Sequence, residues 1–145
     1  DALSSFYYNA SNSYHLFFQG FTLADNDDHL SCEISSGDAS CLFETVGENP
    51  DFYESFVDCI ESLRTTDSTP VNNDKSALAL VAESTMTSLK QFPNSIEEDE
   101  ELLESEDLTD LQINAVRARR DEKLCLKKVR LFSEDVRNAM ETGLW

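Results

Sequence analysis

The stretch TDLQINAVRARRDEKLCLKKVRLFSEDVRNAMETG, residues 109–143, predicts the longest element of this chain. Thr109 and Gln112 have the spacing of a capping box, in which two residues satisfy each other's free backbone N–H groups at a helix N-terminus. Apolar and small residues then recur at steps of three and four as far as Gly143, which offers a C-cap. We therefore predict a long helix that begins at Asp110.

The inward face of this helix is predicted from the same periodicity. Unbroken, the helix measures about 50 Å at 1.5 Å per residue, which exceeds a compact domain of this size, so we expect a kink, fraying or an exposed end near Ser133. The predicted inward stripe is Leu111, Ala115, Ala118, Glu122, Cys125, Val129, Phe132, Val136 and Met140.

Further helices are predicted upstream. Apolar residues at helical spacing occur over residues 3–21, Pro50 follows the candidate cap Asn49, Asp74 can cap a helix that ends before Pro93, and Ser95 has capping-box spacing to Glu98. Residues 32–41 are interpreted as a loop or a short helix start, and no β-alternation is predicted. The expected fold is all-α, one domain over residues 1–145: a disulfide-stapled, irregular bundle of five to six helices with a long C-terminal helix.

Four cysteines, Cys32, Cys41, Cys59 and Cys125, occur without a CxxC pair or a histidine cluster. This pattern predicts two disulfides and an oxidising compartment, hence a secreted, extracellular protein whose signal peptide has been removed. The first pairing considered is Cys59 with Cys125 and Cys32 with Cys41. The alternative joins Cys41 to Cys59 and Cys32 to Cys125.

The net charge of −18 disfavours nucleic acid and anionic membranes as partners. Residues 1–116 hold three bases against 24 acids, whereas residues 117–145 hold eight bases against five acids. We expect the acidic segment 97–107 to fold back on the basic one. The candidate partner-binding residues are Arg117, Arg119, Arg120, Lys123, Lys127, Lys128, Glu97, Glu98, Glu100 and Glu101.

Motifs for catalysis, metal binding or cofactor binding are not found, so the sequence predicts neither an enzyme nor a cofactor. His15 is interpreted as structural, and the acidic loop before His29 lacks the glycine and the final glutamate of an EF-hand. Asn9 begins a glycosylation sequon, and residues 117–120 have the spacing of a dibasic cleavage site that a helix would protect.

The four cysteines and the terminal amphipathic helix resemble the organisation of small salivary proteins of blood-feeding flies, the anophensin and albicin group. The resemblance implies binding to host proteins of the contact, kinin or complement pathways. Insect odorant-binding proteins have a Cys-x3-Cys pair, whereas eight residues separate Cys32 from Cys41 here.

The function expected from these observations is that of a secreted, non-enzymatic protein that binds an extracellular protein, as an inhibitor of host haemostasis, kinin or complement pathways. The alternative is a carrier of a small hydrophobic ligand in a helical cavity lined by Phe6, Phe17, Phe18 and Phe56.

Overall fold

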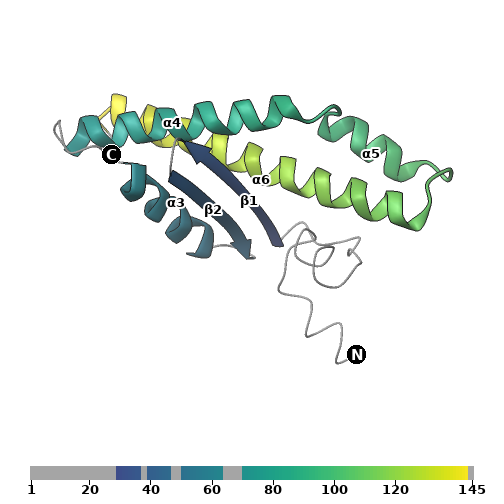
Figure 1. Cartoon of the computed structure of the whole chain (residues 1–145). Helices are drawn as coiled ribbons and strands as arrows, with labels where there is room; N and C mark the ends of the chain where they lie inside the picture. The colour runs from purple at the N-terminus through teal and green to yellow at the C-terminus, as the bar shows by residue number, and fades with distance from the viewer. Residues whose placement is uncertain (1–28, 37–38, 47–49, 64–69, 144–145) are drawn as a thin grey trace.

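The computed structural model describes residues 29–36, 39–46, 50–63 and 70–143. Its elements are, in chain order, β1 (His29–Ser36), β2 (Ala39–Val46), α3 (Pro50–Leu63), α4 (Pro70–Gln91), α5 (Ile96–Glu104) and α6 (Asp110–Glu141) (Figure 1). The helix expected over residues 3–21, together with Asn9, His15, Phe6, Phe17 and Phe18, lies outside the described residues.

An antiparallel hairpin of β1 and β2 shows that the all-α prediction is wrong. Cys32 pairs with Phe43 and Ile34 with Cys41 in the register of the two strands. Cross-strand partners share a face, and these four side chains are buried while the alternate residue Glu33 is exposed. The period-two pattern from residue 30 to residue 34 is thus a strand signal, although residues 32–41 were interpreted as a loop or a short helix start.

The sequence between the strands also carried a hairpin signal. Ser36 pairs with Ala39, so Gly37 and Asp38 are the two residues between the paired positions. A Gly-Asp pair between two short runs of alternating polarity is typical of a two-residue hairpin connection. The hairpin was therefore predictable from local sequence.

Two helices cover the buried face of the hairpin. β2 packs against α3, and β1 packs against α6. The ring of Phe56 from α3 meets that of Phe132 from α6 edge to face, with centroids 4.7 Å apart, and lies 6.3 Å from the ring of Phe43. Aromatic pairs favour this edge-to-face arrangement. Phe56 is only 4 % exposed and therefore belongs to the core, which contradicts its predicted place in the lining of a ligand cavity.

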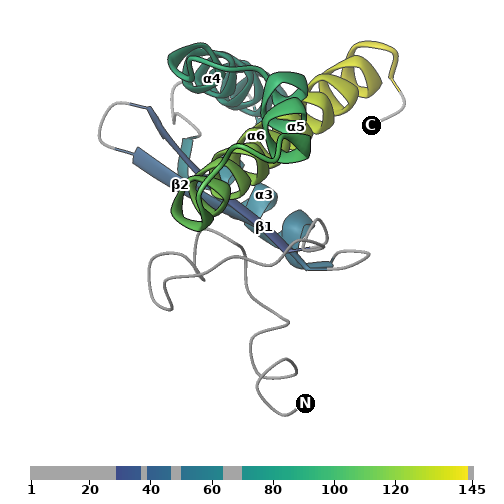
Figure 2. The same cartoon turned by 90° about the vertical axis from the view of Figure 1, so that its right-hand side faces the viewer.

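The remaining helices form a long layer above the hairpin. α4 and α6 run antiparallel and side by side, and α5 packs on α6 at the end where the chain reverses (Figure 1). The hairpin and α3 lie together on one side of the α4–α6 pair, as the rotated view shows (Figure 2). None of the described helices carries an apolar stretch long enough to span a bilayer.

α6 confirms the predicted long helix and its capping box of Thr109 and Gln112. We expected a kink, fraying or an exposed end near Ser133, but α6 is continuous to Glu141, and the buried Ser133 hydroxyl donates to the carbonyl of Val129 at 2.8 Å. Successive parts of α6 pack on α5, α4 and the hairpin, so its length is supported from several sides. Leu111 was assigned to the inward stripe, yet it is 74 % exposed because it precedes most of these contacts.

The disulfides join Cys32 of β1 to Cys125 of α6 and Cys41 of β2 to Cys59 of α3. This is the alternative connectivity, and the first pairing, which joined Cys59 to Cys125, is not formed. The physical reason is the hairpin. Because both strand cysteines face the same layer, each one meets the helix that covers its own strand.

Candidate functional site

A groove of about 410 Å³ runs between β1 and α4. Glu33 and Ser35 line it from β1, where the pleat directs them away from the buried Cys32 and Ile34. The residues that line it from α4 are Leu80, Glu83, Ser84, Thr87, Ser88 and Gln91. The groove thus combines two carboxylates, four hydroxyls and an amide along one apolar side chain.

The polar groups of this groove are partly held by the chain itself. The Ser40 hydroxyl donates to the carboxylate of Glu33, and the Thr87 hydroxyl donates to the backbone carbonyl of Glu83 at 3.0 Å. An extended segment that carries cationic and hydrogen-bonding side chains is the ligand that this lining suits, because carboxylates attract cations and hydroxyls both donate and accept.

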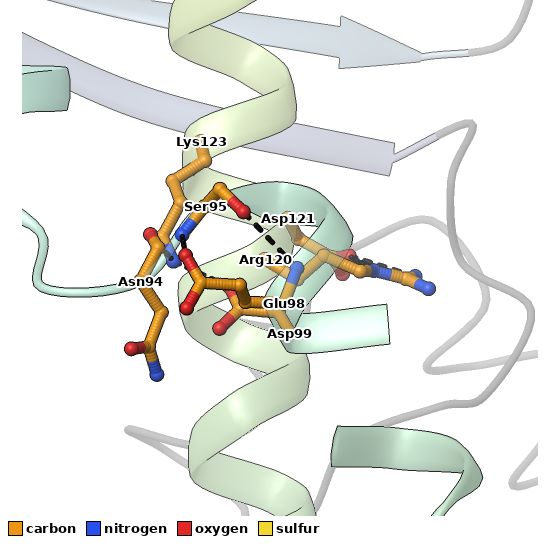
Figure 3. A network of polar contacts seen from close by, with 7 residues as sticks. All are labelled: Asn94, Ser95, Glu98, Asp99, Arg120, Asp121 and Lys123. Atoms are coloured by element: carbon orange, nitrogen blue, oxygen red, sulfur yellow. Dashed lines mark hydrogen bonds and ion pairs between the residues drawn. The ribbon is translucent and has the colours of Figure 1, made fainter. Parts of the chain in front are cut away.

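A buried polar network holds α5 against α6. Lys123 of α6 and Asp99 of α5 are each 2 % exposed and form an ion pair (Figure 3). The Lys123 ammonium also donates to the carbonyl of Asn94 at 2.7 Å and lies 5.1 Å from the centroid of the Phe92 ring. A buried charge is tolerated only where it is paired and hydrogen-bonded, so this network determines how α5 is seated.

Two glutamates near this network have shifted pKa values. The backbone N–H of Ser95 donates to the carboxylate of Glu98 at 3.0 Å in the capping box, and this bond, with the Ser95 side chain, lowers the pKa of Glu98. Partial burial raises the pKa of Glu122, although the nearby Lys123 opposes the rise.

The candidate partner-binding residues do not form one continuous surface. Lys123 is buried, and Arg120 pairs with its neighbour Asp121 at 3.0 Å, while Arg119, Lys127 and Lys128 are exposed. Arg117 is half-buried. The acids Glu97, Glu98, Glu100 and Glu101 are all exposed on α5. The expected fold-back is present as α5 packed on α6, where Asp99, a residue outside the candidate set, pairs with Lys123.

The groove residues were missed by the sequence analysis. Glu33 and Glu83 are 50 positions apart and come together only because α4 packs against β1. Alternation in β1, which separates Glu33 and Ser35 from the buried residues, was the available signal. The position of α4 beside that strand could not be predicted from the sequence.

Comparison with solved structures shows the fold. The chain is similar to the structure titled "Crystal structure of the SET domain of LSMT bound to Lysine and AdoHcy", with a TM-score of 0.68 and 19% identity over 92% of this chain and 39% of that chain. It is also similar to "Structure of Rubisco LSMT bound to AdoMet", with a TM-score of 0.65 and 19% identity over 92% of this chain and 40% of that one. The chain thus spans about two fifths of the length of these structures. No curated protein matches it.

The family comparison corrects the functional expectations. Residues 33–126 match the family described as Rubisco LSMT substrate-binding. The resemblance to fly salivary proteins is wrong, and so is the inhibition of haemostasis, kinin or complement pathways that it implied. The expectation of a non-enzymatic protein that binds an extracellular partner, and its alternative, a carrier of a small hydrophobic ligand, are wrong as well. The four cysteines and the terminal helix suggested an all-helical protein of the salivary type, because the strands of the hairpin had not been predicted.

The match extends from Glu33 within β1 to Leu126 within α6, more than half of the 145 residues, and it includes the second half of β1 and the whole of β2, α3, α4 and α5. The chain belongs to the Rubisco LSMT substrate-binding family.

Proposed function

We propose that this chain is the substrate-binding domain of a protein lysine methyltransferase with a SET catalytic domain. The observation that carries the proposal is the family match over residues 33–126, which covers most of the hairpin, all of α3, α4 and α5, and the first half of α6. The similar solved structures are of LSMT bound to AdoMet, or to AdoHcy with lysine.

The reaction proposed for the whole enzyme is methyl transfer from AdoMet to a lysine. The bond between the sulfonium sulfur and its methyl group breaks, a bond from that methyl group to the lysine side-chain nitrogen forms, AdoHcy leaves, and the nitrogen loses a proton. We assign this chemistry to the length of the LSMT structures that this chain does not span. This chain holds the protein that carries the lysine, since binding energy from remote parts of a substrate serves to orient the reacting groups.

The groove between β1 and α4 is the surface that we assign to the protein substrate. Glu33 and Glu83 supply negative charge to a segment rich in lysine or arginine, and the net charge of −18 favours the approach of a cationic protein. The hydroxyls of Ser84 and Ser88 are placed to bond the backbone of an extended segment in the same groove.

The test is binding of the chain to a protein acceptor, followed by methylation. Rubisco is the first probe because the family description names it, and an array of lysine-centred 15-residue peptides is the second. In biolayer interferometry the parent chain is expected to bind, and Glu33→Gln with Glu83→Gln is expected to weaken binding by about three- to tenfold. The matched control, Glu97→Gln with Glu100→Gln, removes the same charge from two exposed positions on α5.

Two results decide the proposal. Equal weakening by both double variants would mean that only overall charge matters and that the groove is not the docking surface. If the parent chain bound none of the probes, and deletion of residues 29–143 from the complete enzyme left tritium transfer from labelled AdoMet to Rubisco and to the peptides unchanged, the role in substrate binding would be refuted.

We also propose that the protein resides in an oxidising compartment or outside the cell. All four cysteines are paired, and such disulfides persist where glutathione does not reduce them. Thiol titration of the protein isolated from its native source, in denaturant without reductant, is expected to find no free thiol. Two or four thiols per chain would contradict this location.

A further inference from the structure

A second cavity, of about 200 Å³, lies between α4 and α6 on residues that the proposed function does not use. The described residues that line it are Met86, Leu89, Lys90 and Arg130. Two of the four are cations and two are apolar, and there is no carboxylate among them. In a chain of net charge −18 such a lining is locally opposite in sign to the molecule as a whole.

The guanidinium of Arg130 carries a buried donor without an acceptor. Its Nε atom is inaccessible to solvent and has no hydrogen-bond partner among the described residues. A buried charged donor that is left unpaired costs free energy, so native structures pair such groups with protein, water or ligand. The planar, charged guanidinium group is matched in shape and in sign of charge by a carboxylate.

The apolar half of the lining specifies what accompanies that carboxylate. Met86 is 40 % exposed, a large apolar side chain open to solvent, and Leu89 packs on the core beneath it. The cavity has the volume of roughly seven water molecules in the liquid, which is room for one aliphatic side chain beside a carboxylate. Methionine is flexible and adapts to varied apolar partners.

We propose that this cavity, defined by Met86, Leu89, Lys90 and Arg130, is a docking site for a segment of a partner protein in which an acidic residue adjoins an aliphatic one. Charge complementarity selects the acid, and the exposed Met86 receives the aliphatic side chain. A second copy of this chain is disfavoured as the occupant, because two molecules of charge −18 repel each other. The proposal does not depend on the methyltransferase assignment.

The test uses the whole chain and three end-blocked, fluorescein-labelled peptides: Leu-Glu-Leu-Glu-Leu, its glutamine counterpart and its lysine counterpart. In fluorescence anisotropy at physiological salt, the acidic peptide is expected to bind about fivefold or more tightly than the glutamine peptide. Arg130→Gln and Lys90→Gln are each expected to weaken it by about tenfold. The matched control Lys127→Gln removes an exposed charge of α6 outside the cavity and is expected to change affinity less than about twofold.

A further variant keeps the test decisive if Arg130→Gln does not fold. Met86→Glu places a carboxylate inside the cavity from an exposed position, so the folded variant is expected to bind the acidic peptide no better than the glutamine peptide. The proposal is overturned if the parent shows no preference for the acidic peptide, or if Lys90→Gln and Met86→Glu leave its affinity unchanged. Concentration-dependent dimerisation in sedimentation velocity that Met86→Glu abolishes would show that a second copy, rather than a partner protein, occupies the site.

Discussion

At the scale of single residues, burial of Lys123 and Asp99 makes the junction of α5 and α6 sensitive to substitution. The ammonium of Lys123 is surrounded by a carboxylate, the carbonyl of Asn94 and an aromatic ring. The free-energy cost of desolvating two charges offsets most of the favourable energy of their attraction. The pair therefore specifies geometry more than it adds stability. Removal of one partner alone leaves the other charge buried and unpaired.

Lys123→Met is therefore expected to lower the free energy of unfolding by about 3–5 kcal/mol. The double variant Lys123→Met with Asp99→Leu is expected to recover most of that loss, because no charge remains buried. Urea denaturation measures both, with Lys127→Met as an exposed control on the same helix. A double variant as unstable as the single one would show that the lysine acts through packing rather than charge.

Glu122 gives the fold a pH dependence of known sign. Burial raises its pKa above the ordinary value of 4.5, so the folded state holds this proton more tightly than the unfolded state does. Stability from this group is complete below the unfolded pKa and is lost as the pH rises through the folded one. Glu122→Gln is expected to be more stable than the parent at pH 7 and equally stable at about pH 4. The difference at pH 7 is expected to be less than about 1 kcal/mol, because the side chain is half exposed.

Melting curves of Glu122→Gln and of the exposed control Glu141→Gln at these two pH values check the prediction. A difference from the parent that is the same at both pH values would indicate a packing effect instead of a titration.

At the scale of elements, α6 owes its N-terminus to a local motif. The Thr109 hydroxyl accepts from the backbone N–H of Gln112 at 3.2 Å, and the Gln112 side chain accepts from the backbone N–H of Thr109 at 2.9 Å. The same reciprocal arrangement begins α5 at Ser95 and Glu98. Because each box joins residues three positions apart, both were identified from sequence.

Thr109→Ala is expected to cost about 1 kcal/mol of unfolding free energy, since the backbone N–H of Gln112 at the start of α6 loses the hydroxyl that accepts its hydrogen bond. The control is Thr87→Ala, which removes an exposed hydroxyl that is bonded to the carbonyl of Glu83 within α4. Chemical denaturation followed by circular dichroism compares them. Equal, small losses in both variants would mean that the cap of α6 adds nothing beyond an ordinary surface hydroxyl.

At the scale of the whole molecule, the two disulfides tie each strand of the hairpin to a different helix. Cys32–Cys125 joins residues 93 positions apart, and Cys41–Cys59 joins residues 18 apart. On the chain-entropy account, loops of these lengths constrain the unfolded state by about 4.5 and about 3 kcal/mol respectively.

Replacement of Cys32 and Cys125 by alanine is therefore expected to destabilise the fold more than replacement of Cys41 and Cys59. Guanidinium denaturation of the two double variants gives the order. Peptide mapping without reductant is expected to link the peptide of Cys41 to that of Cys59. A Cys59–Cys125 link in that map would contradict the architecture described here, because those residues belong to different cysteine pairs.

The sequence by itself determined the features that depend on neighbours a few residues apart. α3 and α6 begin at the predicted positions, the capping boxes are formed, and Phe56, Cys59, Ile60 and Leu63 are on the predicted buried face of α3. Helix starts and amphipathic faces are local properties of backbone hydrogen bonding and of the 3.6-residue period. The hairpin was also encoded locally, and its omission was an error of interpretation.

Only the tertiary structure decided which distant groups meet. Four features require separate elements to pack in one arrangement. They are the disulfide of Cys32 with Cys125, the buried pair of Lys123 and Asp99, the groove lined by Glu33 and Glu83, and the cavity lined by Lys90 and Arg130. Local propensity carries no information on that arrangement, which is selected by burial of the shared core. The candidate sites of this protein lie between elements and were therefore beyond the reach of the sequence pattern.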